Sequence, residues 1–477
     1  PTIVTRCEIR TMPIEEQERY AAAVHRMMEG DGTPESSPFF HLAGIHGWPG
    51  KGTESNYSYC EHRQETFPAW HRAYLTCFEA ALQDADRQNG NDGLIALPYW
   101  DVINHPELNG QMIPDIIKRR FPNGTDTIRK LLREPSEEDD DDSRQNGQRK
   151  RLWETGYQLR EGLEEAAFVE AIRKNELHRI AGHAMWIGQH YRAASSIGKT
   201  NEDSIESPHD QVHVLLGYPM ASLMHAAFHP IFWLHHSNID RLYESYLRYH
   251  PDSQLEFESN QEAQHVVHPK QKARDRYDHW LEPFHLPKSI SSSEEKFYPR
   301  HSFETRRLGY VYDHLLTRPN QALTAPPVRA VFSSIDITAL PSSYQLLVYG
   351  YKKGSAKEIF EDPPLGPTLA DALAHPNYLG LGALFAGRAD VCANCQEGEP
   401  FDVRVDITSG LRRLGLSPSE VELKVIVFAC SEHPGEWLTL DQTPIPQPEV
   451  HGGRGPPPRP RLDLDDSPAA ASSSSSS

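Results

Sequence analysis

The chain has 477 residues, more than one domain usually holds, so we expect two domains with appended segments. Its 48 Lys and Arg residues against 67 Asp and Glu residues give a formal net charge of −19, which speaks against a nucleic-acid partner. No apolar run approaches the roughly 20 residues of a membrane span, and no hydrophobic signal core opens the chain. We therefore expect a soluble protein without a membrane partner, in the cytoplasm or elsewhere inside the cell, with secretion as the alternative. The six scattered cysteines do not form a disulfide scaffold, which favours a reducing compartment.

Helical patterns fill the first part of the chain. Residues 12–30 begin with a proline near the first turn and end at a glycine, both of which are helix boundary signals. Residues 68–90 repeat large apolar side chains at every fourth position, and residues 232–251 form a third helix that its last proline stops. The charged segment 134–151 is typical of a solvated insertion. These patterns predict a mainly helical domain over residues 1–320.

The pattern changes after Pro319. The segments FDVRVDIT and VELKVIVFAC alternate apolar with polar residues or are rich in β-branched residues, which is typical of strands. We predict a linker at 321–326, a small β-rich, sandwich-like domain at 327–447, and a disordered tail rich in proline and serine at 448–477.

Histidines form two groups. The first group is His41, His46, His62 and His71, and the second is His209, His213, His235 and His236. His209 and His213 are four residues apart, so a helix presents both imidazoles on one face. One such pair is more often an accident than a metal site, but two groups within aromatic helical sequence favour a site for one or two metal ions. Imidazole ligands suit copper, zinc, iron or nickel, so the residues alone leave the metal open.

Five segments together carry a resemblance. They are GIHGWP, YCEHRQETFPAWHRAY, LPYWD, SPHDQVH and HPIFWLHHSNIDRLY, in that order along the chain. They resemble the tyrosinase, catechol oxidase and hemocyanin family of type 3 dicopper proteins over most of residues 1–320. The resemblance implies a four-helix bundle that holds two copper ions. It assigns His46, His62 and His71 to the first copper, and His209, His213 and His236 to the second.

The same resemblance gives roles to residues beside these ligands. In relatives with Cys-x-His at this place, a thioether joins the cysteine sulfur to the histidine ring, and Cys60 and His62 match that motif; the alternative is a free buried thiol. Glu206 and Asp210 match positions implicated in deprotonating a monophenol, and a pair of carboxylates raises the pKa of one of them. The plainer alternative is that both are ordinary acidic residues in the first turn of a helix, without a catalytic role. Many tyrosinases have asparagine where this chain has Asp210.

One position departs from the family pattern. His229 stands where the family usually has an aspartate before proline, which puts the local hydrogen bonding in doubt. Arg72 and Asp240 match the pattern. Tyr310 and Tyr312 supply the Tyr-x-Tyr element that typically closes the catalytic domain.

Residues 327–447 resemble the C-terminal domain of precursor polyphenol oxidases, in which a side chain covers the copper site until the linker is cut. We expect the glycine-rich segment YLGLGALFAGR to be a loop that carries the plug, an exposed Phe385 rather than Tyr378. Cys392 and Cys395 form a CxxC pair of soft ligands that favour Cu(I), which fits a copper-loading role. A local disulfide and half of a zinc site are the alternatives.

The expected function is copper-dependent oxidation of phenols by O2 to o-quinones, including monophenol hydroxylation and o-diphenol oxidation. The expected enzyme is latent until its C-terminal domain is removed. Its expected partners are small phenols, O2 and an activating protease, and self-association is left open. A catechol oxidase without monophenolase activity and an oxygen carrier of the hemocyanin kind are the alternatives within the family. A histidine-rich zinc-binding or structural protein is the alternative outside it.

Overall fold

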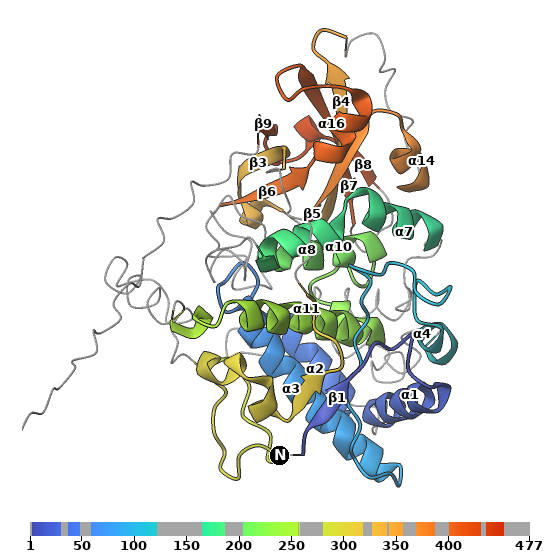
Figure 1. Ribbon diagram of the computed structural model, residues 1–477, viewed down its shortest axis with the longest axis vertical. Coiled ribbons are helices and arrows are strands. Elements are labelled where there is room, and N and C mark those ends of the chain that lie inside the picture. The colour runs from blue at the N-terminus through green and yellow to red at the C-terminus, as the bar shows by residue number, and fades with distance from the viewer. Residues whose placement is uncertain are drawn as a thin grey trace, which may run out of the picture.

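A computed structural model of the chain has a helical domain and a smaller β-rich domain (Figure 1). It describes residues 2–29, 37–47, 59–121, 165–186, 204–255, 257, 280–317, 327–340, 343–355, 369–386, 400–430 and 436–452. The predicted insertion at 134–151 and linker at 321–326 lie outside these residues.

The helical domain contains most of the helices. They are α1 (Ile14–Met28), α2 (Pro38–Gly47), α3 (Phe67–Gln88), α4 (Asp115–Arg120), α7 (Glu165–Lys174), α8 (Leu177–Trp186), α10 (Glu206–Leu216) and α11 (Pro230–Tyr249). Short turns η2 (Ala226–Phe228), η4 (Pro299–Phe303) and η5 (Thr305–Leu308) accompany them. In Figure 1, α7, α8 and α10 lie between the β-rich domain and the remaining helices. The three helices predicted from periodicity are confirmed as α1, α3 and α11.

Helix α3 is buried along most of its length because its apolar side chains repeat with the helical period. Phe78 stacks on Trp233 of α11 with 3.8 Å between ring centroids, and Tyr74 packs on the same indole at 4.6 Å. All three side chains are fully buried. Burying side chains of this size stabilises the fold by about 1.5–3 kcal/mol each, so this aromatic layer holds α3 against α11.

Helix α11 begins earlier than its sequence pattern indicates. It starts at Pro230, and the imidazole Nδ1 of His229 accepts a hydrogen bond of 3.2 Å from the backbone N–H of Ile231. Burial lowers the pKa of His229 to about 3, so the ring is neutral and Nδ1 can accept. The histidine therefore caps the helix much as an aspartate does, which answers the doubt raised by its place in the motif. His236 therefore lies in the second turn of α11.

A buried ionic network closes the helical domain. Strand β1 (Val4–Arg6) pairs in parallel with β2 (Tyr310–Tyr312). Asp240 of α11 accepts hydrogen bonds from the hydroxyls of Tyr310 at 2.7 Å and Tyr312 at 2.6 Å. Its carboxylate also lies 2.5 Å from Nε of Arg72 and 3.2 Å from Nη1 of Arg6. Burial alone would raise the pKa of Asp240, but the two guanidinium groups outweigh it and hold the pKa below its ordinary value. The Tyr-x-Tyr element thus joins the two ends of the domain.

The β-rich domain has two antiparallel sheets. The four-stranded sheet has the order β5 (Tyr378–Leu384), β4 (Tyr344–Lys352), β7 (Val421–Ala429) and β8 (Glu436–Thr439). The three-stranded sheet has the order β6 (Phe401–Asp406), β3 (Arg329–Ile335) and β9 (Glu449–His451). Short helices α14 (Leu369–Ala374) and α16 (Thr408–Leu414) and turns η6 (Ile337–Ala339) and η7 (Leu440–Gln442) join them.

The two sheets pack closely where β5 carries glycine. A Cβ atom on Gly382 would lie 2.7 Å from the side chain of Val405 and 3.3 Å from that of Val403, both on β6. The glycines of this segment therefore allow the sheets to approach, and the segment is a strand rather than the loop we expected. The predicted tail boundary is also too early, because Glu449 to His451 pair with β3. The sandwich-like fold class is confirmed.

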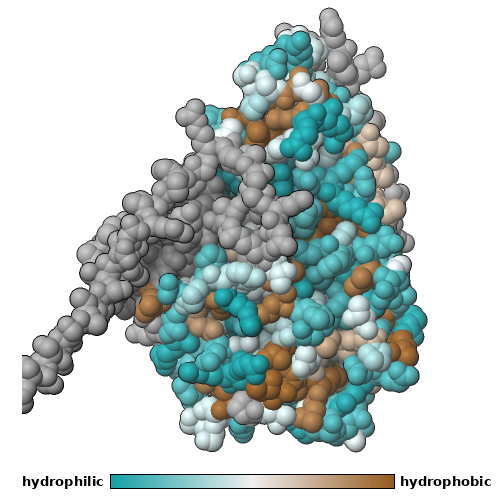
Figure 2. Space-filling model, in the orientation of Figure 1, coloured by the Kyte–Doolittle hydropathy of each residue, from teal (hydrophilic) through white to brown (hydrophobic). Residues whose placement is uncertain are grey.

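The face drawn in Figure 2 is mostly hydrophilic, with hydrophobic residues in separate areas. None of the described helices is both long and apolar enough to cross a membrane.

Candidate metal centre

Three of the predicted ligands meet between α2 and α3. His46 is in the last turn of α2, His71 is in the second turn of α3, and His62 lies on the segment that leads into α3. Their ring centroids are 5.3 to 5.9 Å apart. Nδ1 of His46 is 2.9 Å from the carbonyl of Leu223, and Nδ1 of His71 is 2.8 Å from that of Phe67. Because a carbonyl only accepts, Nδ1 carries the proton in both rings and Nε2 is left with a lone pair.

A second group faces the first from α10 and α11. Nε2 of His236 lies 3.3 Å from Nε2 of His209 and 3.2 Å from Nε2 of His213. Two nitrogens that each lie about 2 Å from one metal ion are separated by about this distance. Nδ1 of His213 is 2.7 Å from the carbonyl of Met220, which fixes that ring as well. The rings of His71 and His236 stack across the two groups with 4.6 Å between centroids.

His235 offers an alternative third ligand for the second group. One nitrogen from each of His209, His213 and His235 can be chosen so that all lie within 4.8 Å of one another. We favour His236 because its Nε2 converges with both other nitrogens and its ring also faces the first group. The ring of His235 instead lies flat on that of His209, at 5.4 Å and 17°. His41, which the motif leaves out, is exposed on α2.

The nitrogens of this cluster are suited to a metal. Nε2 of His46, Nε2 of His71 and both ring nitrogens of His62 are buried and have no hydrogen-bond partner among the described residues. Burial lowers the pKa of His46 to about 4, and burial with the neighbouring rings lowers the pKa of His62 and His213 well below the ordinary value. Buried polar atoms without partners are costly, and neutral imidazoles are good ligands for transition metals. The residues therefore fit two metal ions, one for each histidine group.

Phe385 of the β-rich domain reaches this cluster. It follows β5 directly, its side chain is fully buried, and its ring stacks on the imidazole of His213 with 4.4 Å between centroids and 23° between planes. The same ring meets His62 edge-on at 5.4 Å and His209 at 5.9 Å. Our expectation of an exposed Phe385 was wrong, because the histidine cluster itself covers the ring. Tyr378, at the far end of β5, donates a hydrogen bond of 2.7 Å to Asn175 and has no contact with the cluster among the described interactions.

Two carboxyl groups border the second histidine group. Glu206 is fully buried and accepts a hydrogen bond of 2.8 Å from the backbone N–H of Arg63. Asp210 is buried, and its Oδ1 lies 2.8 Å from Nδ1 of His209. Burial, followed by the charge of Glu206, raises the pKa of Asp210 well above its ordinary value. Both side chains are thus buried groups beside the cluster and not the solvated acids of the plainer alternative.

Further contacts hold the β-rich domain on the helical domain. The side-chain amide of Gln345 on β4 donates a hydrogen bond of 3.1 Å to the carbonyl of Val214 on α10. Asn175, between α7 and α8, accepts hydrogen bonds from Tyr378 at 2.7 Å and from the backbone N–H of Leu381 at 2.8 Å. Arg179 of α8 forms an ion pair with Asp406 of β6. Sequence reasoning missed these interface residues, because an isolated Gln, Asn or Arg carries no motif.

The structure gives less information on the cysteines singled out in the sequence. Cys60 is buried two residues before His62, as a thioether requires, and the bond itself stays a prediction. Cys392 and Cys395 lie outside the described residues.

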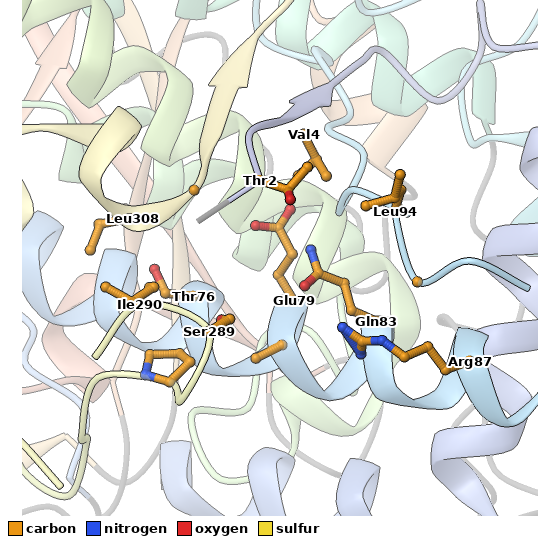
Figure 3. A pocket seen from close by; sticks show the side chains of 14 residues that line it. Thr2, Val4, Thr76, Glu79, Gln83, Arg87, Leu94, Ser289, Ile290 and Leu308 are labelled. Carbon is orange, nitrogen blue, oxygen red and sulfur yellow. The ribbon is translucent and has the colours of Figure 1, made fainter. Parts of the chain in front are cut away.

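A separate surface pocket lies beside α3, where Glu79 and Gln83 rise toward Thr2 (Figure 3). Glu79 is held there by Arg6 at 3.0 Å and by the backbone N–H of Leu97 at 2.8 Å, so its carboxylate serves the fold.

Comparison with known sequences points to one family. Residues 36–249 match the sequence profile described as the common central domain of tyrosinase. The chain is 30% identical to polyphenol oxidase 2 of Agaricus bisporus over 58% of this chain and 55% of that protein. It is 27% identical to hemocyanin 1 of Megathura crenulata over 58% of this chain and 7% of that protein. The chain thus spans about half the length of the curated polyphenol oxidase that it matches.

Solved structures extend the similarity of fold to the β-rich domain. An Aspergillus oryzae pro-tyrosinase mutant superposes with a TM-score of 0.61 at 18% identity, over 90% of this chain and 91% of that chain. A functional unit of octopus hemocyanin gives a TM-score of 0.56 at 18% identity, over 95% of this chain and all of that chain. Both domains therefore have the architecture of these proteins.

Proposed function

The chain belongs to the tyrosinase family of type 3 copper proteins, and on this premise we propose that it oxidises phenols with O2 to o-quinones. The observation that carries the proposal is the pair of buried histidine groups with convergent, unpartnered nitrogens. His46, His62 and His71 would hold one copper ion, and His209, His213 and His236 the other. The copper pair would supply the redox chemistry, taking electrons from the phenol and passing them to O2.

The protein's own residues would position the phenol and its proton. The imidazoles of His62, His209 and His213 enclose a slot that the ring of Phe385 fills, and a phenol ring of the same size would lie there. Glu206 is buried beside this slot, and we propose that it takes the proton of an incoming monophenol. The hydrogen bond from the backbone of Arg63 orients its carboxylate.

The hydrogen bond between Asp210 and His209 favours a positioning role for Asp210. Its carboxylate lies at Nδ1 of the imidazole whose Nε2 belongs to the metal cluster, and such partners fix the orientation of a ligand ring.

Latency is the second part of the proposal. The ring of Phe385 occupies the position that we assign to the substrate ring, so the uncut chain would turn over slowly. Cleavage by a protease and loss of the β-rich domain would expose the slot. The contacts of Gln345, Asn175 and Arg179 support a stable covered state. We further propose that Cys60 forms a thioether with His62, that the protein is intracellular, and that self-association is compatible with this function.

An oxygen carrier is the second candidate, because the octopus hemocyanin unit shares the fold over 95% of the chain. Oxygen uptake by copper-loaded protein, before and after limited proteolysis, with a monophenol and its matching diphenol, separates the candidates. Turnover of both phenols after cleavage supports a latent tyrosinase, and turnover of the diphenol alone supports a catechol oxidase. Reversible oxygen binding without turnover supports a carrier and contradicts the proposal. His213→Ala should abolish turnover while the chain still folds.

A further inference from the structure

His62 is the ligand of the first histidine group that depends most on its own segment. His46 and His71 lie in helices, and backbone carbonyls fix their rings. His62 lies on the irregular segment 59–66, and both of its ring nitrogens lack a hydrogen-bond partner among the described residues. The direction of this ring is therefore set by packing and by the backbone that carries it.

Glu61 ties this segment to helix α3. Its carboxyl group is buried and accepts a hydrogen bond from the hydroxyl of Thr66, the residue before the first turn of α3. A threonine at this position often caps its helix, yet the hydroxyl of Thr66 forms no capping hydrogen bond. Pro68 in the first turn has no N–H, so the helix has one donor fewer to satisfy there. The hydroxyl is thus used to hold Glu61, the residue next to His62.

The backbone turns sharply directly after His62. Arg63 has a φ of 60°, in the left-handed region that a residue of this type rarely adopts. Such a conformation persists only where the surrounding contacts enforce it. The backbone N–H of Arg63 donates a hydrogen bond of 2.8 Å to Glu206 of α10, which ties the segment to the second histidine group. The bond between Glu61 and Thr66 ties it on the other side to α3.

The β-rich domain also holds this segment in the uncut chain. The guanidinium of Arg63 donates a hydrogen bond to the backbone carbonyl of Phe385, and its Cζ lies 4.7 Å from the ring centroid of Phe401. Both partners leave if the β-rich domain is removed. The bond between Glu61 and Thr66 lies within the helical domain, so it would hold the segment in both states.

We propose that Glu61 is a positioning residue for the first metal ion: by binding Thr66, it holds the segment of His62 against the start of α3. The inference rests on the ligand assignment of the proposed function, and not on turnover of a phenol. The predicted thioether could not replace this bond, because Cys60 and His62 both lie on the same segment. It would fix the ring to its own segment, whereas Glu61 fixes that segment to the helix that carries His71.

Equilibrium dialysis of the full chain against buffered copper tests the inference. Glu61→Ala and Thr66→Val should each weaken the first copper position by about 10- to 100-fold, the range typical for loss of a residue that orients a metal ligand. Glu61→Gln and Thr66→Ser keep the acceptor and the hydroxyl, so they should retain most of the affinity. If Glu61→Ala does not fold, the comparison of Thr66→Val with Thr66→Ser decides the question.

Two further variants show which copper position is affected. His236→Ala leaves the first position intact, and His46→Ala leaves the second. Adding Thr66→Val should weaken copper binding in the His236→Ala protein and leave it unchanged in the His46→Ala protein. Thr76→Val is the matched control, because Thr76 is a buried threonine of α3 whose hydroxyl donates a hydrogen bond of 2.8 Å to the carbonyl of Arg72. It should leave both positions unchanged.

Unchanged copper affinity in both Glu61→Ala and Thr66→Val would overturn the inference, as would equal weakening in the His236→Ala and His46→Ala proteins. The same holds if Thr66→Ser binds copper as weakly as Thr66→Val. Oxidation of phenols by the parent chain, with normal binding of both copper ions by Thr66→Val, would overturn this inference alone. Selective weakening of the first position in a chain that oxidises no phenol would support this inference and contradict the proposed function.

Discussion

The ring of Phe385 and the imidazole of His213 lie face to face, although 172 residues separate them in the chain (385 − 213) and they belong to different domains. One partner is a predicted copper ligand, and the other directly follows strand β5 of the β-rich domain. This single contact connects the candidate metal centre, the proposed substrate position and the β-rich domain that covers them. Substitution of one of the two residues at a time therefore tests these features directly.

Phe385→Ala should raise oxygen uptake by the uncut, copper-loaded chain with a diphenol. Loss of the stacked ring removes about 1.5–3 kcal/mol of stabilisation that its burial provides. The fraction of molecules with an uncovered slot should therefore rise about 10- to 100-fold. Phe332→Ala, a truncation of an equally buried phenylalanine within the β-rich domain, is the control. If both variants activate equally, loosening of the domain rather than removal of the plug is responsible.

His235→Ala and His236→Ala should differ in copper content. Loss of a ligand weakens the second metal position, so His236→Ala should retain about one copper per chain and His235→Ala about two. Atomic absorption on dialysed protein measures the ratio. The reverse result would make His235 the third ligand and correct the assignment that we favour.

Glu206→Gln should separate the two oxidation reactions. The amide cannot take a proton, so hydroxylation of a monophenol should fall by about 10²-fold, while oxidation of the matching diphenol is largely retained. Initial rates of both reactions on the cleaved enzyme give the comparison. Equal loss of both activities would show that Glu206 supports the metal centre and does not act on the phenol proton.

Asp240→Asn should destabilise the helical domain strongly. The substitution leaves Arg6 and Arg72 buried with less compensating charge, which typically costs about 3–5 kcal/mol. Urea denaturation followed by tryptophan fluorescence measures the change. Asp92→Asn, which removes an exposed partner of Arg19, should change the stability by less than about 1 kcal/mol. Similar midpoints for the two variants would contradict the structural role of the network.

His229→Asn should make the protein less sensitive to acid. The pKa of His229 is about 3 in the folded protein and about 6.5 when unfolded, so below pH 6.5 protonation favours the unfolded state. At pH 5 this linkage costs about 2 kcal/mol, and it is absent above pH 7. Asparagine retains the helix cap without titrating, so the two proteins should match at pH 7.5 and diverge at pH 5. Parallel stability profiles would show that His229 is not buried in neutral form.

Local patterns predicted the helices, because helical periodicity depends on residues that are close in sequence. The i, i+4 pair of His209 and His213 needs only a helix to share a face. The family resemblance, and not local spacing, assigned His46, His62, His71 and His236 as the other ligands, and that assignment stays a prediction. The start of α11 was missed although Pro230 in its first turn is a local start signal, whereas capping by a neutral His229 requires burial, which the sequence does not show.

Phe385 was predicted as the covering residue, but the conformation of the segment before it was not predicted correctly. Glycines in the segment before Phe385 are typical of a loop, yet here they allow two sheets to pack closely. The partners of Arg63 could not be predicted at all, since its guanidinium meets residues 322 and 338 positions away (385 − 63 and 401 − 63). Such long-range contacts depend on how the domains dock and not on any motif.

The parallel pairing of β1 with β2 has a consequence for where a protease can cut. Residue 6 and residue 312 are neighbours in this two-stranded ribbon, and Asp240 binds side chains from both strands. A cut beyond Asp313 would leave this closure intact, so the helical domain would keep both of its ends fastened. A cut before Tyr310 would instead release the second strand and strip Asp240 of two hydroxyl donors. The ribbon therefore separates cuts that would leave the helical domain closed from cuts that would open it.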